Sequence, residues 1–187
     1  MSEYLPLIVL LLLGASGAAV YLFLRQRKRK AVIALITDGV DVLAHWTYTP
    51  AEWQKAVADE FTWASAKGET GELYFSQTAI YIRSDSHEHL ISLADQGRVV
   101  TYADYRGTDD SPLKLRVRWK VIRQQGTARQ EVKYHKEDYR IPVPRAAKAQ
   151  AQQVAEFFTK RLENNLDAYT DLVSEDEPIS LFGKDSF

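Results

Sequence analysis

One strand-like run in this chain has the residue types and the spacing to bind an anion. In Leu113–Arg123, "LKLRVRWKVIR", every second residue is a cation: Lys114, Arg116, Arg118 and Lys120. In an extended strand such positions share one face and lie about 6.7 Å apart, which suits neighbouring phosphate groups. The alternating apolar residues would then point into a core.

Two interpretations of this basic run stay open. The following strand carries Glu131, Glu137 and Asp138, and a turn before the run carries Asp109 and Asp110. Cross-strand pairs of opposite charge commonly neutralise such a face, and this is the interpretation we favour. The alternative is contact with an anionic lipid surface, a nucleic acid or another polyanion.

A second group of residues could bind a divalent metal. Asp85, His87 and His89 alternate in "SDSHEHL", so in an extended segment they would share a face, and His135 could add a fourth ligand. This would make the chain a metal-dependent hydrolase. The competing interpretation is a solvated polar loop, which we favour because no spaced metal-binding signature accompanies the residues.

Evidence for other catalysis is weak. Asp38, Asp41 and His45 combine carboxylates with an imidazole, but Asp38-Gly39 is typical of a turn. The chain has no cysteine and no glycine-rich phosphate loop. We therefore expect no enzyme activity and no cofactor.

The composition of the segment after residue 171 predicts an acidic, flexible tail with apolar anchors. Its composition cannot build a core of its own, and such segments typically dock into a groove. "ISLF" resembles part of the short motif by which bacterial proteins bind the replication sliding clamp, with Pro178 in place of the leading Gln. The tail could dock onto a partner or back onto its own chain. The expected anchors are Ile179, Leu181, Phe182 and Phe187.

The chain also contains a candidate membrane anchor. Residues 4–24 carry no charge over a length of about 30 Å as a helix, which matches the hydrocarbon core of a bilayer. A cluster of cations, "RQRKRK" at 25–30, follows the apolar run at once, which predicts a single pass with the N-terminus outside and the remainder cytoplasmic. A cleaved signal peptide is disfavoured by Glu3 and by the apolar run that resumes at 20–24.

Small residues recur every four positions within this span, a spacing that lets transmembrane helices pack closely. We therefore expect a homo-oligomer or a membrane partner. The packing positions are Gly14, Ala15, Ala18 and Ala19.

The elements that must position these residues follow from local patterns. Residues 31–37 are ambiguous between helix and strand, and 40–48 read as a strand. Thr49-Pro50 with Glu52 forms a capping box that starts a helix to about residue 65. Strands follow at 72–75, 78–83, 89–94, 98–105, 113–123 and 130–144, with a hairpin turn at 95–97. An amphipathic helix spans 145–169.

The predicted fold class is α+β: a transmembrane helix, a mainly antiparallel β domain and a C-terminal amphipathic helix. This element order resembles a pleckstrin-homology domain, which implies a β-barrel closed by the last helix, and "KLRVR" resembles the Lys-x-Arg-x-Arg pattern of its phosphoinositide-binding members. The alternative is an open antiparallel sheet with both helices on one face. The expected domains are an anchor at 1–30, an α+β domain at 31–171 and a tail at 172–187.

These features predict a non-catalytic interaction or scaffold module in a membrane-associated complex, at a bacterial inner membrane. Its expected partners are the membrane and a protein or a second copy. Anionic lipid is the alternative partner, and an anionic-lipid or polyanion sensor is the alternative function. Residues after 30 are more acidic than basic in sum, which disfavours nucleic acid.

Overall fold

A computed structural model describes residues 5–65, 67–109, 111–125, 129–169 and 172, with the side chains of 5–19, 21, 96, 124, 125, 129, 130, 167 and 168 excluded. The chain divides into two units, one up to Val40 and one from Asp41 onward. The second unit is α+β with antiparallel sheets, as the sequence predicts.

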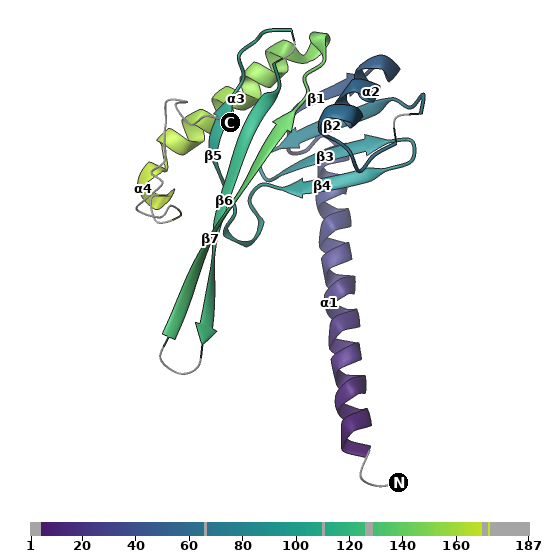
Figure 1. Ribbon diagram of the computed structural model, residues 1–187, viewed down its shortest axis with the longest axis vertical. Coiled ribbons are helices and arrows are strands. Elements are labelled where there is room, and N and C mark those ends of the chain that lie inside the picture. The colour runs from purple at the N-terminus through teal and green to yellow at the C-terminus, as the bar shows by residue number, and fades with distance from the viewer. Residues whose placement is uncertain (1–4, 66, 110, 126–128, 170–171, 173–187) are drawn as a thin grey trace. The chain divides into compact units, whose positions relative to one another are not determined.

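The first unit is a single long helix, α1, from Leu5 to Thr37 (Figure 1). The ambiguous segment 31–37 therefore continues a helix, and does not form a strand. Among the residues described, the structure contains no helix with the length and apolarity needed to cross a bilayer. The side chains at the expected packing positions, Gly14, Ala15, Ala18 and Ala19, lie outside the described part of the structure.

The second unit begins with strand β1, Val42–Tyr48, and helix α2, Pro50–Asp59. Thr49 Oγ1 accepts from the backbone N–H of Glu52, while a Glu52 carboxylate oxygen accepts from the N–H of Thr49 at 3.0 Å. This reciprocal pair confirms the capping box. The rings of Tyr48, just before the cap, and Trp53, in the first turn after it, lie 5.6 Å apart, which is the contact of a hydrophobic staple.

The first antiparallel sheet has the order β1-β2-β3-β4. Its further strands are β2 at Gly71–Ser76, β3 at Ala79–Ser84 and β4 at Glu88–Ser92. Ser76 turns the chain between β2 and β3, because its Oγ accepts from the backbone N–H groups of Thr78 and Ala79 at 3.2 and 2.9 Å. This bond explains why the predicted break at Ser76-Gln77 is a tight turn.

The second antiparallel sheet has the order β5-β6-β7. Its strands are β5 at Val99–Asp104, β6 at Leu113–Gln125 and β7 at Arg129–Ile141. A 3-10 turn, η1 at Asp95–Gly97, carries the chain from β4 into this sheet. The prediction that 89–94 and 98–105 form a hairpin is therefore wrong, because the two strands belong to different sheets.

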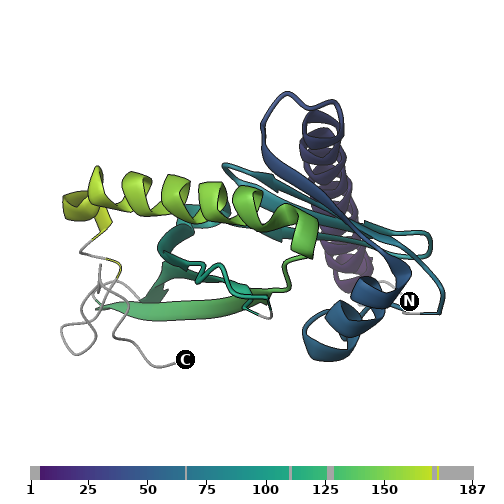
Figure 2. The ribbon, with the colours of Figure 1, turned by 90° about the horizontal axis from the view of Figure 1, so that it is seen from above.

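The last helices hold the two sheets together. A 3-10 turn, η2 at Arg145–Ala147, leads into α3, Lys148–Glu163, and a short α4 follows at Leu166–Tyr169. Helix α3 packs against β5 of one sheet and β1 of the other (Figure 2). The predicted apolar stripe is confirmed over its central part, where Ala151, Val154, Phe158 and Leu162 are buried.

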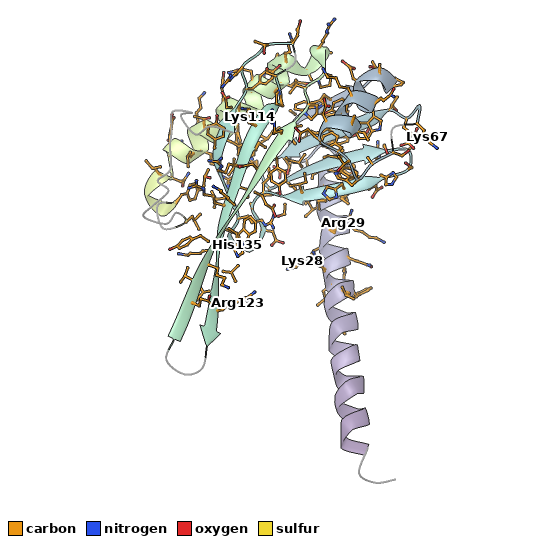
Figure 3. All side chains as sticks on the ribbon, in the orientation of Figure 1. Lys28, Arg29, Lys67, Lys114, Arg123 and His135 are labelled. Carbon is orange, nitrogen blue, oxygen red and sulfur yellow. The ribbon has the colours of Figure 1, made fainter. Side chains whose placement is uncertain are left out.

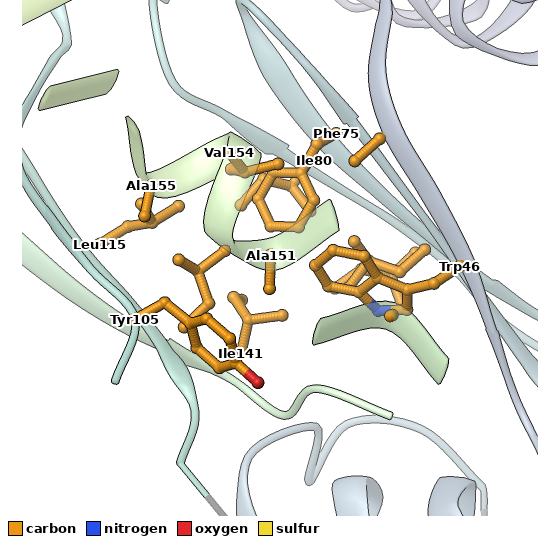
Figure 4. Packing of buried hydrophobic residues seen from close by; sticks show 14 of the residues in the cluster. Trp46, Phe75, Ile80, Tyr105, Leu115, Ile141, Ala151, Val154 and Ala155 are labelled. Atoms are coloured by element: carbon orange, nitrogen blue, oxygen red, sulfur yellow. The ribbon is translucent and has the colours of Figure 1, made fainter. Parts of the chain in front are cut away.

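The core lies where α3 meets the inner faces of both sheets (Figure 4). Trp46 and Phe75 enter it from the first sheet, and Leu115 and Ile141 enter it from the second. The strands form two separate sheets within the described residues, with no closed barrel, so the barrel implied by the pleckstrin-homology resemblance is wrong. The single open sheet is also wrong, because η1 breaks the pairing between β4 and β5.

Candidate interaction surface

Strands β6 and β7 form a ribbon that projects beyond their sheet (Figure 1). The pairing of β5 with β6 reaches only as far as Val99 opposite Arg118. The pairing of β6 with β7 continues to Gln125 opposite Arg129. A two-stranded ribbon of this kind leaves both faces and both edges open, and it has little stability of its own in water.

The outer part of the ribbon exposes apolar side chains on one face. Ile122 lies opposite Val132, and Lys120 lies opposite Tyr134, so these four share a face. Ile122 is 55% exposed, Val132 42% and Tyr134 47%. We call Ile122, Val132 and Tyr134 the tip surface.

The opposite face of the ribbon is held at its base by a three-layer stack. The imidazole of His135 stacks on Trp119 with ring centroids 5.2 Å apart and an interplanar angle of 12°. The Arg98 guanidinium lies 4.2 Å from the same Trp119 ring and donates to a Glu137 carboxylate oxygen at 3.2 Å. The Tyr139 hydroxyl donates to the same carboxylate, and burial together with this negative charge raises the pKa of Tyr139. The stack and its ion pair fix the ribbon beside the first residue of β5.

Closer to the sheet, Lys114, Arg116, Arg118 and Lys120 lie on the same face of β6 as Ile122 of the tip surface. We call this face the basic face. Arg116 and Arg118 are buried, with 6% and 3% exposure. Lys114, which is labelled in Figure 3, and Lys120 are half-buried. Arg116 lies opposite Asp138 and donates to its carboxylate through Nε at 2.6 Å and Nη2 at 3.2 Å. This bidentate geometry fixes the guanidinium orientation as well as its charge.

The register separates the acidic residues that were expected to neutralise this face. Glu137 lies opposite Val117 and Glu131 lies opposite Arg123, so both point to the Trp119 side. Of the three acids on β7, only Asp138 shares the basic face. Asp109, from the preceding loop, forms an ion pair with Lys148 instead.

The structure does not bring the candidate metal ligands together. His89 packs its ring against Trp63 at 4.6 Å, and His87 Nδ1 is 2.6 Å from Ser86 Oγ. The His135 ring is stacked on Trp119, in the other sheet. In the part of the chain that is described, no three histidine or carboxylate side chains form a group able to hold a metal ion. Asp85 is exposed.

His45, the histidine of the acid–base candidate, lies in β1. The His45 imidazole is exposed and stacks on Tyr74, with centroids 4.1 Å apart and an interplanar angle of 12°. Its neighbour Trp46 is buried in the core and donates through Nε1 to the Tyr48 hydroxyl.

A groove of about 650 Å³, which the sequence did not reveal, lies between α2 and the loops on either side of the β6–β7 hairpin. Tyr48 lies in its wall and donates its hydroxyl hydrogen to the Pro142 carbonyl at 2.7 Å. Burial raises the pKa of Tyr48, so the hydroxyl remains a neutral donor. The lining comes from three separate segments, which share no local sequence pattern.

The charges around this groove are mixed in sign and engaged with one another. Glu60 lies 3.5 Å from the Arg140 guanidinium, and partial burial raises the pKa of this glutamate. Glu52 accepts from the Thr49 cap and from the backbone N–H of Arg145 at 3.4 Å. These mixed charges favour neither an anionic nor a cationic ligand, so the groove does not indicate a class of ligand.

The expected anchors of the tail lie outside the described residues. This holds for Ile179, Leu181, Phe182 and Phe187. Comparisons with models of protein families, with curated proteins and with solved structures find no match to this chain.

Proposed function

We propose that this protein is a membrane-anchored, non-catalytic interaction module whose ribbon binds a protein partner through the tip surface. The proposal includes a single membrane pass at residues 4–24, with the N-terminus outside and the α+β unit in the cytoplasm, at a bacterial inner membrane. The anchor is supported by the sequence, in which an uncharged run of 21 residues is followed at once by "RQRKRK".

The single observation that carries the partner site is the exposure of Ile122, Val132 and Tyr134 on a projecting two-stranded ribbon. Clustered apolar side chains on an otherwise polar surface are typical of protein–protein contacts. The open edges of β6 and β7 add backbone N–H and C=O groups that a partner strand can pair with. A ribbon therefore offers apolar contact and directional hydrogen bonding in one place.

An anionic-lipid or polyanion sensor has one observation in its favour. Glu131 and Glu137 face away from Lys114, Arg116, Arg118 and Lys120, so these two carboxylates do not lie on the face that carries the four cations. The burial of both arginines opposes this function, because a lipid or nucleic-acid phosphate must reach the guanidinium groups. A metal-dependent hydrolase draws no support from the positions of its candidate ligands.

The energy available at the tip surface sets the expected effect of changing it. Fully burying an isoleucine or valine side chain contributes about 1.5–3 kcal/mol. Ile122 and Val132 each expose about half of their surface, so a partner that covers them gains about 1 kcal/mol from each. Replacing both with serine should therefore weaken binding by about 2 kcal/mol, or about 30-fold.

The test is purification of the full chain in mild detergent, with mass spectrometry of proteins that co-elute in stoichiometric amount. We expect one defined partner, retained by Val40→Ser and lost from the double variant Ile122→Ser/Val132→Ser. Val40 is a matched control because it is an apolar residue with 72% exposure outside the ribbon. Equal recovery of the partner from both variants, or elution of the wild-type chain alone, would contradict the proposal.

A further inference from the structure

Strand β7 is a long and exposed edge of its sheet. The described residues contain four edge strands, which are β1 and β4 in the first sheet and β5 and β7 in the second. Helix α3 packs against β1 and β5, and β4 has only 5 residues. Strand β7 has 13 residues, pairs with β6, and is exposed at every position from 132 to 136. Every second residue of such an edge directs its backbone N–H and C=O groups outward.

Few of the devices that keep an edge strand single are present in β7. A short strand, a proline or a β-bulge prevents pairing with another chain. Residues 129–141 contain no proline, and they pair with β6 continuously, without a bulge. Lysines also protect edges, and β7 carries Lys133 and Lys136. Whether these lysines oppose or favour a second strand depends on the residues that lie opposite them.

A second copy of β7 matches this edge in length. Two copies related by a two-fold axis pair antiparallel, so one residue lies opposite its own copy and residues equally far from it lie opposite each other. His135 is the middle residue of β7 and is labelled on the ribbon in Figure 3. Only an axis at His135 pairs the whole strand from Arg129 to Ile141.

The charges of β7 are complementary in this register. Lys133 of each copy lies opposite Glu137 of the other, which gives two cross-strand pairs of opposite charge. The side chains are 48% and 41% exposed, so both can reach a neighbouring strand. The Glu137 carboxylate already accepts from Arg98 and Tyr139, and a carboxylate has acceptor positions for a further donor.

The neighbouring registers place like charges opposite each other. An axis at Tyr134 puts Glu131 opposite Glu137, and an axis at Lys136 puts this lysine opposite its own copy. Like charges directly opposite are destabilising. The same residues that disfavour these registers therefore favour the one centred on His135.

The basic face adds a second contact in this register. Tyr134 lies opposite Lys136 of the other copy, and an ammonium group beside a tyrosine ring is attracted by its π-system. Val132 lies opposite Asp138, whose carboxylate accepts from Arg116 of its own chain. This face therefore places no two like charges opposite each other at these positions.

We propose that the protein forms a two-fold homodimer in which the β7 edges of two copies pair antiparallel about His135. The two three-stranded sheets then join into one sheet. Both tip surfaces lie on the same face of it, because opposite residues of antiparallel strands share a face. This interface is separate from the one proposed above, since the edge of β6 beyond Arg118, where pairing with β5 stops, remains for the partner of the tip surface.

The first experiment is disulfide cross-linking of the full chain in mild detergent, which is specific because the sequence contains no cysteine. Opposite α-carbons of antiparallel strands lie about 4.5–5.5 Å apart, within the range of a disulfide. We expect His135→Cys to form an intermolecular disulfide on mild oxidation. The matched control is Lys133→Cys, on the same face of the same strand. Its two copies would lie about 14 Å apart, so it should react at least about tenfold more slowly.

A mixture of two variants tests the same register with His135 intact. Lys133→Cys mixed with Glu137→Cys should give a disulfide between the two variants, whereas neither variant alone should give one. Circular dichroism checks that each variant is folded. Equal rates for His135→Cys and Lys133→Cys would overturn the proposal. The absence of a disulfide from the mixture would overturn it as well, even where His135→Cys has lost its stack on Trp119.

Charge exchange supplies a measurement without cysteines. Light scattering of the wild-type chain should give the protein mass of two copies, and Lys133→Glu should raise the dissociation constant about tenfold because it places a carboxylate opposite Glu137. The double variant Lys133→Glu/Glu137→Lys should restore the wild-type value. A monomeric wild type, or an unchanged dissociation constant in Lys133→Glu, would overturn the dimer. Loss of the tip-surface partner in Ile122→Ser/Val132→Ser with the dimer intact shows that the two interfaces fail separately.

Discussion

The substitution Gly71→Ala tests the packing that holds α2 on the first sheet. Gly71 is the first residue of β2 and pairs with Tyr48 on one side and Ser84 on the other. The Trp53 ring of α2 lies directly on this glycine. A Cβ atom at position 71 would approach Cε3, Cζ3 and Cδ2 of that ring to under 3.0 Å. Trp53 has no exposed surface, so its ring must move as a whole.

The contacts that the ring would lose set the size of the effect. Trp53 Nε1 donates to the Ser65 carbonyl at 3.1 Å, a bond worth about 1 kcal/mol. The ring also packs on Tyr48 and on Phe61, with centroids 5.6 and 5.7 Å apart, each worth about 0.5–1.5 kcal/mol beyond the area buried. Overpacking alone costs about 1–3 kcal/mol. These terms together span about 3–7 kcal/mol, and since the ring loses only part of its contacts, we expect Gly71→Ala to lower the free energy of unfolding by an amount near the lower end, about 3–4 kcal/mol.

The assay is urea unfolding of the full chain in detergent, followed by far-ultraviolet circular dichroism so that loss of a tryptophan does not disturb the signal. A double-mutant cycle with Trp53→Leu separates the clash from other effects of alanine. If the ring causes the loss, Gly71→Ala should cost less than about 1 kcal/mol in the Trp53→Leu background. The same full loss in both backgrounds, or a loss below 1 kcal/mol in the wild-type background, would refute the reasoning.

Three further predictions concern polar contacts. Thr49→Ala should lower the free energy of unfolding by about 1 kcal/mol in urea, because it removes the helix cap, whereas Thr49→Ser should have little effect. Partial burial would raise the pKa of Glu52, but its hydrogen bonds with Thr49 outweigh this effect and the pKa is lowered. The stabilisation that the ionised Glu52 carboxylate gives to the folded state is therefore present above about pH 4.5 and is lost as the pH falls through the lowered pKa. Unfolding measured from pH 7 to pH 2 should therefore show the wild type losing its advantage over Glu52→Gln in acid; a constant difference would contradict this. Asp138→Asn should destabilise by about 1–2 kcal/mol, because buried Arg116 loses an anionic partner that is itself one-third exposed; an unchanged urea midpoint would exclude that role.

The local elements were predictable because their signals lie within a few residues. The capping box at Thr49 and Glu52 has reciprocal partners three positions apart, and the structure forms both bonds. The α3 stripe repeats at helical spacing, and its central members are buried. Backbone geometry alone places such residues together, whatever the rest of the chain does.

The pairing of distant strands was not predictable in the same way. Asp95-Gln96-Gly97 does turn the chain, but a turn motif does not say whether its flanking strands pair with each other. Here β4 pairs with β3, and β5 pairs with β6, so the turn links two sheets. The groove beside Tyr48 was missed for a related reason, since its walls come from segments up to about a hundred positions apart.

The basic strand shows where the two kinds of information divide. The sequence by itself determined that Lys114, Arg116, Arg118 and Lys120 share a face, because side chains alternate along any strand. Only the tertiary structure decided that Glu131 and Glu137 lie on the opposite face, because a shift of one residue in the pairing of β6 and β7 would have moved both to the basic face. That register depends on hydrogen bonds and core packing along the whole hairpin, and these exist only once the sheet is formed.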